Sequence, residues 1–133
     1  MTTTTTRDEL SVTRTATQAD AQLIVSLLNG PLGLRASDGM SLLFTYDEAP
    51  TYEQFVADHP VGSKGFQDVN AVLGLNETIG TFVKQGLLDR GLVHDLLWIQ
   101  GAWGRCERLA LHFREQSGEP KIYENFEALA RTT

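Results

Sequence analysis

The sequence lacks the features that would indicate a disulfide framework, a metal knuckle or a membrane segment. It contains one cysteine, Cys106, which excludes an intramolecular disulfide and a CxxC metal motif. No apolar run approaches the roughly 20 residues that span a bilayer. Residues 1–22 contain no apolar core of the kind found in signal peptides. We therefore expect a soluble, cytoplasmic protein that has no membrane segment.

Basic residues are also few, with 11 lysines and arginines against 17 acidic residues and a net charge of −6. Nucleic-acid binding usually needs a basic stripe that neutralises phosphates, so this balance counts against a nucleic-acid partner. A chain of 133 residues with 41% hydrophobic residues is large enough for one core. We expect a mobile N-terminal arm over residues 1–16 and a single helical domain over residues 17–133.

Recognisable catalytic and metal-binding motifs are missing. His94 and His112 are separated by 18 positions, about 27 Å of helix, so they cannot share an ion. His59 precedes a proline in a loop, and the sequence has no HExxH, GxSxG or P-loop pattern. We expect no metal and no cofactor, and the sequence favours a protein that is not an enzyme.

What the sequence does contain is helical periodicity. Thr17, followed three positions later by Asp20, is typical of a helix start and predicts a helix over 17–30. Within residues 31–50, the segment "MSLLFTY" could be a short helix or a strand, and we favour a helical turn or two because no partner strand is evident elsewhere. A short helix is expected over 50–60. Stronger apolar patterns cover 66–86 and 89–117, and Asp89 can cap the second of these helices. The second has a heptad-like seam made by Leu92, Leu96, Ile99, Trp103, Cys106, Ala110 and Phe113.

A last helix is expected over 120–132, with proline in its first turn. The whole pattern predicts an all-α fold, an antiparallel bundle of about five helices. It should be dominated by a long helical hairpin formed by 66–86 and 89–117, because the link between them is very short.

Two polar residues interrupt the first arm of this hairpin. Asn76 lies inside the apolar arc and comes level with Gln100 on the second arm, so a hydrogen bond between the two amides could fix the register of the helices. Glu77 lies near the edge of the arc, two turns before Lys84. It is either one member of a boundary ion pair or part of a carboxylate–guanidinium site in a groove.

The second half of the chain resembles a known family. The segment "ETIGTFVKQGLLD", a following tryptophan and the closing "IYENFEALA" resemble a family of small helical bacterial proteins catalogued as a domain of unknown function. The matching positions are Glu77, Gly80, Gly86, Asp89, Trp98 or Trp103, Tyr123, Asn125, Phe126 and Glu127. The resemblance implies a helical fold and no assigned reaction. Some members look as if a membrane segment precedes this domain, and we expect none in this chain.

Two functional hypotheses follow. The first is a non-enzymatic interaction or oligomerisation module that binds itself, as a homodimer, or another protein. The second is a small-ligand-binding protein or enzyme with a pocket near Glu77 and the C-terminal aromatic segment. A basic helix face that includes Arg105 and Arg108 is either solvated or a docking strip for an acidic partner. The candidate pocket or interface residues are Asn76, Glu77, Trp98, Gln100, Trp103, Arg105, Arg108, Tyr123, Asn125 and Phe126.

Overall fold

The computed structural model describes residues 15–132, and the described part is all-helical. Helices make up 73% of it and no strand occurs there, which confirms the all-α prediction. Seven helices are present in this range, so the expected number of about five is approximate. Most of the predicted N-terminal arm lies outside the described residues. The helices are α2 (Gln18–Asn29), α3 (Pro31–Leu43), α4 (Tyr52–Asp58), α5 (Lys64–Lys84), α6 (Arg90–Leu96), α7 (Ile99–Ser117) and α8 (Glu124–Ala130).

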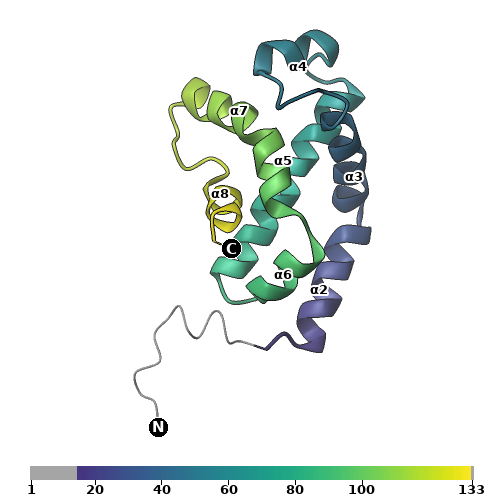
Figure 1. The fold of residues 1–133 in the computed structure, drawn as a ribbon, viewed down its shortest axis with the longest axis vertical. Coiled ribbons are helices and arrows are strands. Elements are labelled where there is room, and N and C mark those ends of the chain that lie inside the picture. Colours follow the sequence, from purple (N-terminus) through teal and green to yellow (C-terminus); the bar gives the residue numbers. More distant parts are fainter. Residues whose placement is uncertain (1–14, 133) are drawn as a thin grey trace.

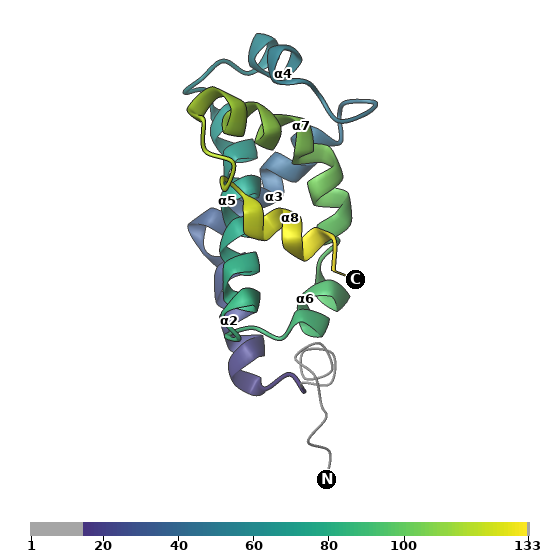
Figure 2. The ribbon, with the colours of Figure 1, turned by 90° about the vertical axis from the view of Figure 1, so that its left-hand side faces the viewer.

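The central element is α5, the longest helix, which has α3 on one side and α7 and α8 on the other (Figure 1). Figure 2 shows α8 crossing α5, with α6 below it and α4 at the far end. Two glycines allow α5 to approach its neighbouring helices closely. A Cβ atom added to Gly39 would lie 2.2 Å from the carbonyl oxygen of Asp68, and one added to Gly80 would lie 2.4 Å from that of Asn125. Neither helix pair could pack this closely with a larger residue.

The hydrophobic core lies between α5 and the helices packed on it. Leu73 and Ile79 of α5 are fully buried, as are Leu43 of α3, Leu109 of α7 and Phe126 of α8. Burial of such side chains contributes roughly 1.5–3 kcal/mol each. Within the described range, no helix is both long and apolar enough to cross a membrane.

The prediction of one continuous helix over 89–117 is wrong. Leu97 is extended (φ −125°, ψ 143°) and ends α6, and a new helix begins at Ile99. Apolar spacing does not distinguish one long helix from two shorter helices that bury their faces in the same core. The predicted hairpin is changed accordingly, since α5 packs most extensively against α3 and α8 and less against α7.

The segment after the first helix is also more regular than expected. In place of a turn or two, Pro31–Leu43 forms a full helix with proline at its first position. The predicted caps are confirmed. Thr17 and Asp20 form a reciprocal capping box, and the carboxylate of Asp89 accepts a hydrogen bond from the backbone N–H of Leu92 at 2.8 Å.

Candidate functional site

The predicted site residues do not form a single pocket. Asn76 and Trp98 line a groove beside α3, whereas Glu77 contacts the start of α8 on another side of α5. The remaining candidates are distributed along α7 and α8. The structure therefore divides the candidates into a junction between α5 and α8 and a groove between α3 and α7.

Glu77 holds the first turn of α8. Its Oε1 atom accepts hydrogen bonds from the backbone N–H groups of Asn125 at 3.0 Å and Phe126 at 2.9 Å, and Oε2 accepts one from Asn125 Nδ2 at 2.9 Å. The residue before the helix, Tyr123, adopts a left-handed conformation with φ 58° and supplies no side-chain cap. A carboxylate is favourable at a helix N-terminus, where free N–H groups give a partial positive charge. Glu77 thus replaces the missing local cap from 48 positions away.

The aromatic candidates around this junction are packing residues. Trp103 meets Phe126 edge-on, with ring centroids 5.1 Å apart. The guanidinium of Arg114 lies 5.7 Å from the Trp103 ring and forms an ion pair with Glu127 at 2.8 Å. Burial raises the pKa of Tyr123, and the neighbouring charges add to the effect. These side chains pack against one another where α7 meets α8.

A smaller hollow of about 270 Å³ lies beside this junction, where α5 ends and α6 begins. Lys84, Arg90 and Asn125 are among its lining residues. The side-chain nitrogen Nδ2 of Asn125 already donates hydrogen bonds to Glu77 and to Thr81. Lys84, which the sequence places two turns after Glu77 on the same edge of α5, lies on the wall of this hollow.

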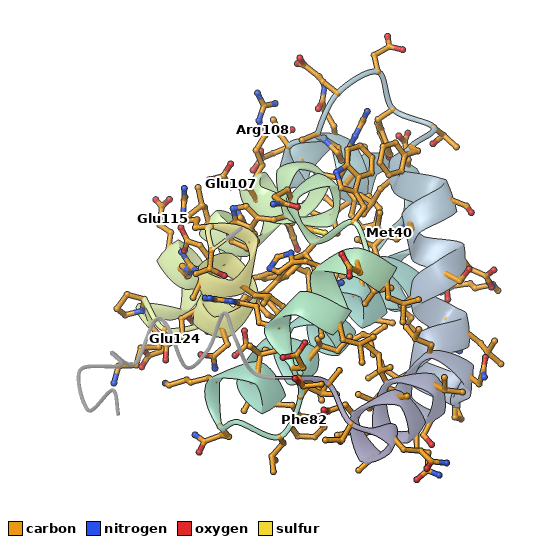
Figure 3. The ribbon with its side chains drawn as sticks, turned by 60° about the horizontal axis from the view of Figure 1, so that its bottom comes forward. Met40, Phe82, Glu107, Arg108, Glu115 and Glu124 are labelled. Atoms are coloured by element: carbon orange, nitrogen blue, oxygen red, sulfur yellow. The ribbon has the colours of Figure 1, made fainter. Side chains whose placement is uncertain are left out.

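The main groove has a volume of about 460 Å³ and runs between α3 and the junction of α6 with α7. Met40, labelled in Figure 3, lines it from α3, and Leu75 and Asn76 belong to α5. None of its lining residues is charged, although 21% of the chain is. They are Leu28, Asn29, Gly33, Leu34, Ala36, Ser37, Met40, Leu75, Asn76, Leu97, Trp98, Ile99 and Ala102.

The edges of this groove carry exposed apolar side chains. Trp98 is 68% exposed and Leu34 is 60% exposed. The Trp98 ring stacks on Phe44 at 6.0 Å with an interplanar angle of 15°. It also lies directly over Gly101, where an added Cβ atom would come within 2.3 Å of it. The guanidinium of Arg105 lies 4.5 Å from the Phe44 ring. The exposed indole is therefore held in place from behind.

Asn76 is only 7% exposed, and its hydrogen bond is local. Its Nδ2 donates to the carbonyl of Val72, one turn earlier, at 2.8 Å. The expected bond to Gln100 does not form, and Gln100 is an exposed residue of α7. With α6 and α7 as separate helices, the register on which that pairing depended is absent.

The predicted basic face of α7 holds a loop. Arg105 Nη1 donates to the carbonyl of Tyr46 at 2.9 Å, and Arg108 Nη1 donates to that of Ala49 at 3.1 Å. His112 stacks on Tyr52 with ring centroids 3.7 Å apart. No sequence pattern indicates these contacts, because they join segments 59 or 60 positions apart. Within residues 15–132, no group of His, Cys, Asp and Glu is arranged to hold a metal ion.

Comparison with known proteins identifies the family. Neither the curated proteins nor the solved structures include a match to this chain. A family model described as "Domain of unknown function (DUF4760)" matches residues 13–133. This match covers almost the whole chain, including the helical segments that carried the resemblance. The chain therefore belongs to the DUF4760 family, a domain of unknown function.

Proposed function

We propose that this protein is a non-enzymatic helical association module whose groove between α3 and α7 binds a segment of a partner protein. One observation carries the proposal: the groove is lined without a single charge and is bordered by the exposed side chains of Leu34 and Trp98. Contiguous exposed apolar surface with a polar surrounding marks interaction sites in soluble proteins. A pair of helices with a hydrophobic groove between them also suits an incoming amphipathic helix.

The state of the ionisable groups supports a role without catalysis. The carboxylate of Glu77 is occupied by α8. Burial raises the pKa of the Cys106 thiol to about 12, so it remains protonated at neutral pH. The His112 ring is stacked on Tyr52. Each of these groups has a packing role, and none lines the groove.

A pair of matched variants tests the proposal. Leu34→Asp places a charge at the groove edge, while Leu87→Asp places the same charge at a side chain of similar exposure, 56%, which is not among the groove residues. Proteins retained by immobilised wild type and by Leu87→Asp, but not by Leu34→Asp, are then purified and tested for direct binding. The proposal predicts at least one such partner. If the two variants retain the same proteins, the groove is not the association site.

The small-ligand hypothesis has a specific observation in its favour, the groove volume of about 460 Å³, which is within the usual range for small-molecule sites. Its location would be this groove and not the surroundings of Glu77. A thermal-shift screen against metabolites tests it, because a ligand that binds the native state raises the unfolding temperature by mass action. A stabilising metabolite that loses its effect in Leu34→Asp would favour this second function.

A further inference from the structure

We propose that the groove selects its partner by one aromatic side chain that carries a single hydrogen-bond donor, a tryptophan or a tyrosine. In this arrangement the N–H or O–H group of the partner donates to Asn76 Oδ1 at the floor of the groove. The inference rests on the proposed function and adds the chemistry of the anchoring residue.

The amide of Asn76 supplies the polar contact. Because Nδ2 donates to the Val72 carbonyl, the amide orientation is fixed and Oδ1 is the atom left for another partner. Among residues 15–132, none donates a hydrogen bond to this oxygen. Asn76 is nine-tenths buried and lines the groove. The oxygen itself remains accessible, and an occupant that covered it without donating to it would leave it unpaired, which costs free energy.

The absence of charge narrows the occupant further. An arginine, lysine, aspartate or glutamate anchor would lose its hydration in this groove without finding an opposite charge among the lining residues. Phenylalanine or leucine would fit the apolar walls but would leave Asn76 Oδ1 without a donor. Tryptophan and tyrosine combine an apolar ring with one donor, and both are enriched at interface hot spots.

The walls suit a flat ring. The Trp98 indole presents a preordered aromatic surface because Phe44 and Gly101 support it from behind. Met40 supplies a flexible thioether from the opposite wall, and sulfur–aromatic contacts are favourable. The volume of about 460 Å³ exceeds that of one aromatic side chain. A rigid receiving surface reduces the entropy that binding costs.

The occupant is another protein and not a second copy of this chain. The exposed tryptophan here is Trp98, and it is already stacked on Phe44 at the edge of its own groove. Inserting it into a second copy would break that stack. Trp103 is buried, Tyr46 and Tyr52 are engaged with Asp58 and His112, and Tyr123 packs edge-on against Phe113. The net charge of −6 also opposes self-association.

The experiment compares two probes that differ in one donor. N-acetyl-L-tryptophanamide is neutral and carries the indole N–H, and its 1-methylindole analogue lacks it. Both are titrated into the full-length ¹⁵N-labelled protein and followed through the amide signals of Gly33, Ser37 and Ala102. We expect the unmethylated probe to bind about fivefold to tenfold more tightly, as one neutral hydrogen bond allows. In Asn76→Leu the two probes should bind equally, whereas the control Asn70→Leu should keep the difference.

The outcomes separate this inference from the proposed function. Equal affinity of the two probes for the wild type overturns the inference even if Leu34→Asp abolishes partner binding, and the association function then survives. If the protein binds the unmethylated probe more tightly but no protein partner depends on the groove, the occupant is a free aromatic molecule and the proposed function is overturned. A concentration-dependent dimer in light scattering that Trp98→Ala abolishes would identify a second copy as the occupant and overturn the choice of another protein.

Discussion

Replacing Glu77 tests whether this residue is a structural cap or part of a functional site. In the structure its carboxylate accepts three hydrogen bonds from Asn125 and Phe126 and is the side chain that satisfies the first turn of α8. Glu77→Ala removes all three acceptor contacts at once. The seven-residue helix α8 would then begin after a left-handed Tyr123 with no side-chain cap.

The expected loss follows from the contacts. A hydrogen bond to a charged group contributes about 1.5–3 kcal/mol, and loss of a helix cap costs about 0.5–2 kcal/mol. The site is only partly buried, so water replaces some of what is lost. We therefore expect Glu77→Ala to lower the free energy of unfolding by about 3 kcal/mol. Glu77→Gln keeps one acceptor oxygen and loses the charge, so it should cost about 1–2 kcal/mol.

Urea unfolding followed by far-UV circular dichroism measures both values. The matched control is Glu115→Ala on α7, an exposed carboxylate labelled in Figure 3, which should change stability by less than about 0.5 kcal/mol. Hydrogen exchange provides a local readout, since the amides of Asn125 and Phe126 should lose protection first. A Glu77→Ala variant as stable as the control would refute the assignment of Glu77 as the cap of α8.

Three further results are expected. Gly80→Ala should destabilise the protein by about 1–3 kcal/mol, because its methyl group would lie 2.4 Å from the Asn125 carbonyl oxygen. The control Gly74→Ala meets no neighbour and should be neutral or slightly stabilising in the same urea titration. Burial lowers the pKa of His94 below its usual value of 6.5. The folded state therefore resists protonation and loses stability as the pH falls below that value. Between about pH 7.5 and about pH 5.5, the unfolding midpoint should fall less in His94→Gln than in wild type. Burial raises the pKa of the Cys106 thiol to about 12, so this thiol should react with a thiol reagent at mildly alkaline pH only after unfolding. Rapid labelling of the native protein would contradict the burial of Cys106.

Local signals in the sequence predicted much of the fold. The reciprocal cap of Thr17 and Asp20 requires only two residues three positions apart, and it is present. The apolar spacing over 66–86 corresponds to α5, and Asp89 caps the following helix as expected. Such features depend on neighbours along the chain, so their spacing contains the necessary information.

Features that depend on tertiary contacts were not predictable in the same way. Glu77 has helical neighbours that suggest a boundary residue, yet its partners are 48 and 49 positions away. The loop contacts of Arg105 and Arg108 span 59 positions. The sequence predicted Asn76 and Trp98 as candidate pocket or interface residues. The groove that they line also depends on α3, which was expected to be only a helical turn or two.

The interruption between α6 and α7 links the failed prediction to the proposed site. Leu97, Trp98 and Ile99 are consecutive in sequence, and all three line the groove. In a continuous helix, successive side chains point about 100° apart, so three in a row could not face one groove. The extended backbone at Leu97 removes that restriction, and Gly101 then leaves room for the Trp98 ring to lie against α7. The break at Leu97 interrupts the predicted seam and creates one wall of the groove. A substitution that made this region a single helix should therefore abolish partner binding while α5 remains folded.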